Sequence, residues 1–452
     1  MSILVIGGGD IGSTLCERLA AENKDVVLVE SSEERLRQLG AVADVQVVHG
    51  NGASPRVLRE AGLDDAEMLI AVTDSDAVNL IACLVASRES VIPTKIARVR
   101  DPDLAAALPG IFGDDPLDLN INPEEEAANA IFKTLKAPGA GAVFEFAEGR
   151  VQVVAFSVDQ PCEAAGVVLS ELKTRLGIES NIVAVSRNEK LLIPDGSTQI
   201  LLGDRIYAAG RPDALASLAE LLGKNSAPVR RVVISGGGGT SYHLAQLLEA
   251  DEDVTAKIIE PDGERCKFLV EHLKRSVVLQ GQGTDPSLLR EENIESADAF
   301  LALTPDDEDN ILSALFAKRS GAGKVMALVN KSSYVPLVSA IGIDAVVSPN
   351  RAAVSAILHF IRKGKVVSVT TVGAEAAEAL EIVALETSEL VGKPLREANF
   401  KEAVVGAIVR GDDVIIPSGD DVIEAGDHVV IFALRSAIPR LERQMMVQLQ
   451  YF

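Results

Sequence analysis

Three glycines near the start of the chain have the spacing of a phosphate-binding loop. Gly7, Gly9 and Gly12 follow an apolar run and precede a segment with helical character. In that setting the first glycine permits a tight turn, the second lets backbone approach a pyrophosphate, and the third lets the helix pack closely on the strand. Asp10 and Ile11 begin the helix, whose free N–H groups attract an anion. The spacing predicts a nucleotide site that includes these five residues.

An acidic residue follows at the distance expected for a contact with ribose. Glu30 ends the second apolar run, 18 residues after Gly12. A carboxylate there can accept hydrogen bonds from ribose hydroxyls. A 2′-phosphate about 4 Å away would be opposed by roughly 1–4 kcal/mol. We therefore expect NAD(H), or another nucleotide with an unphosphorylated ribose such as ATP or ADP, in preference to NADP(H).

The same features recur about 230 residues later in the chain. The second set comprises Gly236, Gly238, Gly239, Ser241 and Glu260. Ser241 stands where the first copy has Gly12. Serine is small enough for close packing, and its hydroxyl could touch a phosphate. Two interpretations stay open: a second working nucleotide site, or a vestigial fold that only maintains the assembly.

Polar loops follow several later strands of both copies. The candidates are Asn51, Gly52, Ala53 and Thr73 in the first copy, with Gln282, Gly283 and Thr304 as their counterparts. The carboxyl ends of parallel strands meet at one edge of a sheet, where open α/β sheets bind ligands. An amide at Asn51 or Gln282 could read an adenine edge. We therefore expect these loops to line the same crevice as the glycine turns.

Some polar residues near these loops allow a purely structural interpretation. Arg98 and Arg100 end the fifth strand, where they could reach a phosphate or form surface ion pairs. Asp76 and Ser54 are interpreted as helix N-caps, because short polar side chains are favoured at those positions.

Strands and helices alternate in both copies, which predicts an α/β fold class with parallel sheets. A smaller strand-rich segment follows each copy, with strands expected at 151–157, 182–186, 199–201 and 205–209 and a helix at 170–176. We expect two Rossmann-like doubly wound domains, each followed by a small α+β lobe, in the order A-B-A′-B′. The expected boundaries are 1–137, 138–223, 229–362 and 363–452, with a polar linker at 224–228. Helices Glu124–Leu135 and Arg351–Ile361 lead out of the two sheets.

Charge and composition exclude several classes of function. The chain of 452 residues has a net charge of −23, which repels nucleic acid and anionic lipid headgroups. No apolar run has the length of a spanning helix. The N-terminus lacks the features of a signal peptide. The four scattered cysteines are expected to be reduced, mostly buried thiols. These features predict a cytoplasmic protein that binds neither nucleic acid nor lipid directly.

Residues that could catalyse a reaction or bind a metal are few in this sequence. The five histidines occur singly, and no His or Cys pair has metal-ligand spacing. A dehydrogenase would need a proton carrier beside the transferred hydride. We therefore expect no catalytic or metal-binding residues and a sensor rather than an enzyme. The alternative is an NAD-dependent oxidoreductase of duplicated form.

Several segments together carry a family resemblance. They are Ile3–Gly12, Glu30, Gly50–Ala53, Ala71–Asp76 with Asn79, Lys95–Arg100, and the hairpins Ile193–Gly196 with Gly203–Asp204 and Ile416–Gly419 with Gly426–Asp427. In this duplicated order they resemble the RCK (KTN) regulators of potassium conductance, and more closely the tandem members that serve Trk potassium-uptake systems. That family usually has aspartate where this chain has Asn51 and Gln282, a departure that bears on adenine selectivity.

The resemblance implies a function and partners. Members of the family are not enzymes. Four chains would assemble into a ring at the inner face of the cell membrane, held there by a membrane potassium channel or transporter subunit of the Trk type. NAD(H) or ATP/ADP bound in the Rossmann-like lobes would change the ring and so gate potassium flux. Helices Glu124–Leu135 and Arg351–Ile361 would join lobes and neighbouring chains.

Overall fold

The computed structural model describes residues 2–39, 45–137, 139–177, 179–188, 190–224, 227–362, 368–372, 377–398 and 400–445. These residues form two compact units. One contains residues 1–127 together with 349–361, and the other contains residues 128–348 together with 362–452. Asn225 and Ser226 of the expected linker lie outside the described residues.

The first unit is built on a parallel six-stranded sheet with the order β3-β2-β1-β4-β5-β6. The strands are β1 Ser2–Ile6, β2 Asp25–Glu30, β3 Gln46–His49, β4 Met68–Ala71, β5 Thr94–Arg98 and β6 Leu119–Ile121. The helices are α1 Asp10–Ala21, α2 Glu33–Leu39, α3 Pro55–Glu60, η1 Leu63–Asp65, α4 Asp76–Glu89 and α5 Pro102–Phe112. The strand order reverses between β1 and β4, which is where doubly wound sheets bind ligands.

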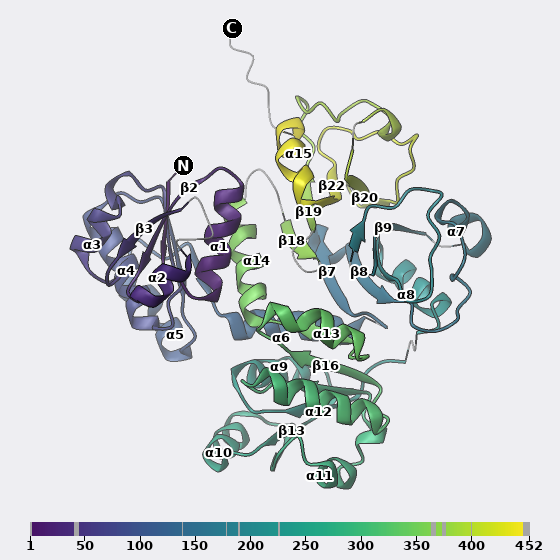
Figure 1. The fold of residues 1–452 in the computed structure, drawn as a ribbon, viewed down its shortest axis with the longest axis horizontal. Coiled ribbons are helices and arrows are strands. Elements are labelled where there is room, and N and C mark those ends of the chain that lie inside the picture. The colour runs from purple at the N-terminus through teal and green to yellow at the C-terminus, as the bar shows by residue number, and fades with distance from the viewer. Residues whose placement is uncertain are drawn as a thin grey trace. The chain divides into compact units, whose positions relative to one another are not determined.

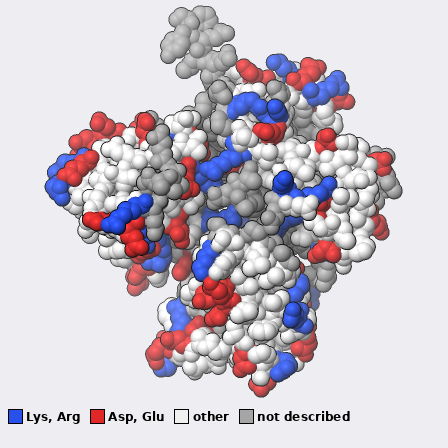
Figure 2. Space-filling model, in the orientation of Figure 1, with Lys and Arg blue, Asp and Glu red and all other residues white. Residues whose placement is uncertain are grey.

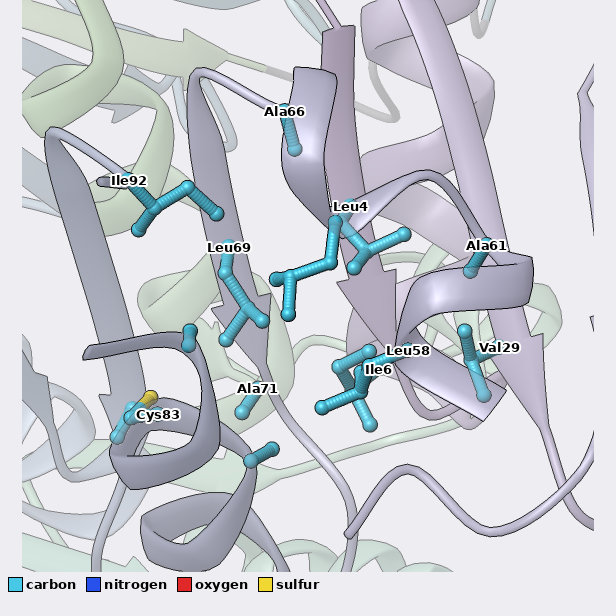
Figure 3. Close-up of a cluster of buried hydrophobic side chains, with 14 of the residues drawn as sticks. Leu4, Ile6, Val29, Leu58, Ala61, Ala66, Leu69, Ala71, Cys83 and Ile92 are labelled. Carbon is cyan, nitrogen blue, oxygen red and sulfur yellow. The ribbon is translucent and has the colours of Figure 1, made fainter. Parts of the chain in front are cut away.

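Both faces of this sheet are buried, which explains why its strands are apolar almost throughout. On one face, Leu4, Ile6 and Leu69 pack with residues of α3 and α4 (Figure 3). Ile6 lies in β1 directly before the glycine turn, so this core fixes where the turn begins.

The other face is covered by α1 together with α14 (Pro349–Arg362), a helix that follows the second sheet in the chain (Figure 1). Val354, Ile357 and Leu358 of α14 are buried against Leu15 and other residues of α1 and the sheet. Burial of three such aliphatic side chains contributes about 5–9 kcal/mol. Helix α14 is therefore an integral part of the first unit.

The second unit contains a parallel sheet with the same order, β14-β13-β12-β15-β16-β17. Its strands are β12 Arg231–Ser235, β13 Thr255–Glu260, β14 Val277–Gln280, β15 Ala299–Ala302, β16 Lys324–Leu328 and β17 Ala345–Val347. Its helices are α9 Gly239–Glu249, α10 Gly263–His272, α11 Pro286–Glu291, η3 Ile294–Ser296, α12 Asp307–Arg319, η4 Ser332–Tyr334 and α13 Val335–Ala340. Ala128, Ile131 and Leu135 of α6 (Pro123–Lys136) belong to its core.

Two antiparallel five-stranded sheets complete the second unit, with the orders β10-β9-β11-β8-β7 and β18-β19-β22-β20-β21. The first lobe contains β7 Ala142–Phe146, η2 Ala147–Gly149, β8 Val151–Ser157, α7 Leu169–Leu176, β9 Ser180–Arg187, β10 Lys190–Leu192, β11 Arg205–Gly210 and α8 Pro212–Leu221. The second contains β18 Ser368–Val372, β19 Ala377–Val383, η5 Leu395–Glu397, β20 Ala403–Arg410, β21 Asp413–Ile415, β22 His428–Leu434, η6 Arg435–Ala437 and α15 Ile438–Met445. The fold class expected from the sequence is confirmed.

The turn carboxylates of these lobes have a structural role. Arg187 binds Asp204 through two hydrogen bonds of 2.7 Å, and Arg410 binds Asp427 in the same way at 2.9 and 2.8 Å. Burial alone would raise the pKa of Asp427, but the hydrogen bonds from Arg410 and a backbone N–H lower it. The strand expected at 199–201 is wrong, because there only Gln199 forms a single bridge.

Lys, Arg, Asp and Glu side chains are interspersed on the face drawn in Figure 2. None of the described helices combines the length and apolar character that crossing a bilayer requires. No three His, Cys, Asp or Glu side chains among the described residues cluster as metal ligands do. Cys16 and Cys83 are free and buried, and burial raises the pKa of each thiol to about 12.

Candidate functional site

A pocket of about 730 Å³ lies in the first unit, at the carboxyl ends of its strands. The glycine turn forms its floor. Gly7 has φ +103°, a conformation that favours glycine. A Cβ at Gly12 would lie only 1.8 Å from the carbonyl oxygen of Gly7. The close packing predicted for the third glycine is therefore present, and no larger residue fits there without moving the turn.

Glu30 fixes the other end of the turn. Its side chain accepts hydrogen bonds from the N–H of Gly8 at 2.6 Å and of Ser32 at 2.7 Å, and the residue is 5% exposed. These two donors hold a negative charge at the pocket wall, where the sequence placed a ribose contact.

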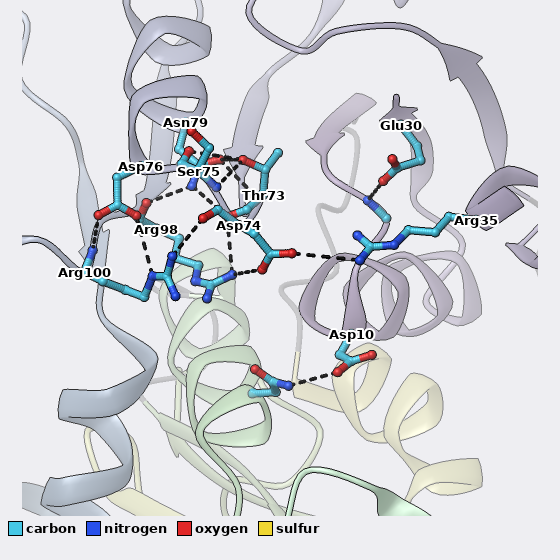
Figure 4. A network of polar contacts seen from close by, with 12 residues as sticks. Asp10, Glu30, Arg35, Thr73, Asp74, Ser75, Asp76, Asn79, Arg98 and Arg100 are labelled. Atoms are coloured by element: carbon cyan, nitrogen blue, oxygen red, sulfur yellow. Dashed lines mark hydrogen bonds and ion pairs between the residues drawn. The ribbon is translucent and has the colours of Figure 1, made fainter. Parts of the chain in front are cut away.

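Three charged side chains face one another across the pocket (Figure 4). The carboxylate of Asp74 lies 3.0 Å from the guanidinium of Arg98 and 3.9 Å from that of Arg35. Arg98 is 11% exposed, so much of its charge is removed from solvent. Asp74 pairs with the two guanidiniums that would also bind a phosphate.

Arg100 does not line the pocket. Its guanidinium donates to the carbonyl of Asp74 at 2.8 Å and lies 3.7 Å from the carboxylate of Asp76. Asp76 is not the N-cap that the sequence suggested, because Ser75 caps α4. The Asp76 carboxylate instead accepts from the N–H groups of Arg100 and Asp101. Ser54 occupies the N-cap of α3 without a side-chain capping bond.

The loops after β3 and β4 close the pocket. The side-chain oxygen of Asn51 accepts from the N–H of Ala53 at 2.9 Å, which orients the amide. A Cβ at Gly52 would lie 2.0 Å from the side chain of Ile6. Thr73 donates its N–H to the buried side chain of Asn79 at 2.9 Å. These contacts hold the loops close to the strand ends.

Most of the residues expected in the first site come together in this pocket. They are Gly7, Gly9, Asp10, Ile11, Glu30, Asn51, Gly52, Thr73 and Arg98. Gly12, Ala53 and Arg100 support it from outside the lining. Ser13, Arg35 and Asn350 line it but were not expected. A signal for Arg35 was present, because Arg265 occupies the same place after Glu260 in the second copy.

The second copy retains the geometry of the turn. Gly236 has φ +98°, and Glu260 accepts from the N–H of Gly237 at 2.6 Å and of Asp262 at 2.8 Å. Thr304 donates its N–H to Asn310 at 2.8 Å, as Thr73 does to Asn79. Gly238 occupies the N-cap of α9, and Gly239 begins that helix.

The charges around the second turn differ from those of the first. Asn79 binds the carbonyl of Arg98, whereas Asn310 binds that of Leu328, so an apolar residue replaces the pocket arginine. Pro305 follows Thr304 where Asp74 follows Thr73. Arg265 turns back to donate to the carbonyl of Gly237 at 2.5 Å and lies over the Phe268 ring.

Ser241 and Gly283 are closely packed in the second copy. Ser241 is fully buried, and its hydroxyl has no hydrogen-bond partner among the described residues. A Cβ at Gly283 would lie 1.8 Å from the hydroxyl oxygen of Ser235. Gln282 follows β14 in the loop before α11. The second turn therefore keeps its backbone form but has lost the arginine and aspartate that face each other across the first pocket.

Comparison with known proteins places this architecture in a family. The TrkA-N domain model matches residues 3–114 and 232–349, and the TrkA-C domain model matches residues 153–223 and 379–446. The chain is 40% identical over 461 aligned positions to the Trk system potassium uptake protein TrkA of Halomonas elongata, with all of both chains covered. It is 37% identical to the protein of that name from Haemophilus influenzae, with 98% of each chain covered.

A solved structure shares the fold. The GsuK channel bound to NAD superposes with a TM-score of 0.60 at 21% identity, covering 98% of this chain and 78% of the channel chain. Both family models occur twice in alternation, in the order that the internal duplication predicted. This chain belongs to the TrkA family.

Proposed function

We propose that the protein is the nucleotide-binding regulatory subunit of a Trk-type potassium-uptake system. The first pocket binds NAD(H), or ATP and ADP, and occupancy changes the shape of a ring of four chains. That ring attaches at the inner face of the cell membrane to the potassium-conducting subunit. Along the chain we propose lobes at 1–137, 138–223, 229–362 and 363–452, with α6 and α14 each packing on the sheet of the other copy.

One observation carries the nucleotide assignment: the pocket whose floor is the Gly7–Gly12 turn and whose wall holds Glu30. The helix N-terminus, two arginines and a fixed carboxylate supply complementary groups for a diphosphate and an unphosphorylated ribose. A channel of the same fold, at 21% identity, has been solved bound to NAD. The Trk system potassium uptake proteins of Halomonas elongata and Haemophilus influenzae, to which this chain is 40% and 37% identical, suggest potassium uptake as the process.

The pocket suits binding better than turnover. Its lining combines glycines and small residues with Glu30, Arg35, Asp74, Arg98 and amides, groups that bind and orient a diphosphate. Linkage then provides the mechanism, because a ligand shifts the ring between two shapes by its differential affinity for them. Coupling of about 1–3 kcal/mol per site, added over several sites, is enough to bias a gate.

Calorimetry with NADH, NAD, ATP, ADP and NADPH tests the assignment directly. We expect NADH to bind and NADPH to bind at least about 5-fold more weakly, because Glu30 opposes a 2′-phosphate. Equal affinities would show that Glu30 does not face the ribose. Steady conversion of NADH with any small substrate would favour the oxidoreductase alternative. Nucleotide-dependent rubidium flux with the co-purified membrane subunit tests the regulatory role.

A further inference from the structure

We propose that Asn350, at the start of α14, is a ligand-contact residue of the first pocket, and that through it a bound diphosphate changes the position of α14. This inference rests on the proposed function. Asn350 is distant in sequence from every other lining residue, yet it lines the same pocket as Gly9 and Arg98. The ligand class is an anionic nucleotide diphosphate.

A hydrogen bond orients the Asn350 amide. Its nitrogen donates to the carboxylate of Asp10 at 3.1 Å, and Asp10 is the first residue of α1 (Figure 4). An amide nitrogen carries two hydrogens, and Asp10 accepts one of them. The second hydrogen is available to a phosphate oxygen in the pocket. Asp10 is thus a positioning residue for Asn350.

Two helix N-termini converge at this hydrogen bond. Both α1 and α14 begin here, and each helix N-terminus carries a partial positive charge. Two like poles brought together repel each other unless negative charge lies between them. In the structure the Asp10 carboxylate fills that role.

Helix α6 is the counterpart of α14 in the duplicated chain, and its first turn is acidic where that of α14 is not. Helices α6 and α14 both begin with proline, but the next residues are Glu124, Glu125 and Glu126 in α6 against Asn350 and Arg351 in α14. Three glutamates in a first turn neutralise the helix pole themselves and repel a phosphate. Gly239 also replaces Asp10 at the start of α9. The amide contact therefore belongs to the first pocket.

The connectivity of α14 makes this contact a route for a signal. Residues 349–361 pack within the first unit, whereas the residues before and after them belong to the second. The buried side chains of α14 hold the helix firmly on the first sheet. A new contact at its first turn is expected to shift the start of the helix rather than to release it. That shift is passed along the chain to both flanking segments.

Calorimetry on the full-length chain tests the contact. Asn350→Ala should weaken NADH binding by about 10-fold, the usual effect of losing a hydrogen bond to a charged group. Asn350→Asp should weaken it further, because a second carboxylate beside Asp10 repels the diphosphate. Asn350→Gln keeps the amide and should recover part of the affinity. Glu124→Ala, at the matching position of α6, should leave the affinity for the first pocket unchanged.

Hydrogen exchange tests whether the bound nucleotide also changes the first turn of α14. The first N–H groups of a helix lack partners within the helix. Saturating NADH should therefore protect residues 350–353 in the unaltered chain, and this protection should be lost in Asn350→Ala. If the unaltered chain binds no nucleotide, the proposed function fails. If it binds NADH and the Asn350 variants bind and protect α14 equally well, only the present inference is overturned.

Discussion

At the scale of single residues, the first pocket depends on glycines that are packed too closely to carry a side chain. Gly12 lies against the carbonyl of Gly7 and Gly52 lies against Ile6, so neither position accepts a Cβ. Gly9 differs, because a Cβ there would meet only the Arg35 guanidinium, at 3.6 Å. Substitutions at Gly9 therefore test ligand binding without disturbing the turn.

Gly9→Asp should abolish measurable NADH binding at the first site. The new side chain and its charge would both collide with the expected diphosphate, and the repulsion alone, about 1–4 kcal/mol, reduces affinity roughly 5- to 1000-fold. Calorimetry at several NADH concentrations measures the loss. Gly9→Ala adds a Cβ without charge, so it should lose less affinity than Gly9→Asp. Gly238→Asp places the same charge on the second turn. If only this variant lost affinity, the nucleotide would be bound by the second copy, and the assignment to the first pocket would be wrong.

Asp74→Asn should raise the affinity for NADH and ADP. Asp74 holds Arg35 and Arg98, and a phosphate must compete with its carboxylate for both guanidiniums. Because Asp74 is largely exposed, the gain should be modest, about 2- to 5-fold. Asp64→Asn removes the same charge from an exposed position outside the pocket lining. An equal gain from both variants would mean that net charge, rather than the contact across the pocket, is responsible.

At the scale of elements, a half-buried lysine ties α6 to the second sheet. Lys324 begins β16 and donates to the carbonyl of Thr134 in the last turns of α6 at 2.6 Å. Burial lowers the pKa of Lys324 to about 8, although Asp344 nearby opposes the shift. A lysine with a lowered pKa costs the fold stability while it is charged, at about 1.4 kcal/mol per pKa unit.

Lys324→Met should therefore raise the thermal midpoint at pH 7, where the lysine is charged in both folded and unfolded chains. As pH rises from 8 to 10.5, the folded chain loses this proton before the unfolded chain does, so the cost disappears. The difference in midpoint between the two proteins should shrink over that range. Scanning calorimetry at pH 7, 8, 9 and 10.5 measures it. A difference that does not change with pH would contradict the assignment.

Much of the element pattern could be predicted because local signals were consistent. The apolar strands of the Rossmann-like sheets were evident from β-branched runs, and Gly12 and Glu30 were evident from spacing. The extra strand at Ala142–Phe146 was not predicted. Asp76 was misassigned because its role depends on backbone N–H groups at Arg100 and Asp101, beyond the reach of a local capping rule.

Asn350 could not be predicted from the sequence as a pocket residue. Its partner Asp10 is 340 residues away, and nothing local distinguishes an asparagine at a helix start from an ordinary cap. The alternation of the two copies was plain in the sequence. The exchange of helices between their sheets was implied only by the family resemblance, which gave both helices as elements that join lobes. Only the packing of α14 residues such as Ile357 with α1 identifies the sheet that this helix covers.

At the scale of the whole molecule, the two halves are alike in fold and unlike in charge. The first turn retains Arg98 and Asp74, whereas Leu328 and Pro305 replace them at the second. Structural contacts common to both, such as Asn79 and Asn310, are kept. The fold is therefore preserved in both copies, while the pocket chemistry has diverged.

The proposed ring predicts a defined mass in solution. Light scattering should give four copies of the 47.7 kDa chain, and adding NADH should change the shape of the assembly rather than its mass. A comparison of sedimentation with and without NADH measures the change of shape. A protein that remains a monomer at micromolar concentration, with or without nucleotide, would contradict the ring.

The placement of α14 also restricts how the gene can be divided. A recombinant piece ending at residue 137 would contain every strand of the first sheet but would lack the helix that covers one face of it. The apolar surface of Leu15, Leu19 and their neighbours would then face water, a condition that favours aggregation. The two halves are covalently interleaved, so the duplication did not leave them as separable modules.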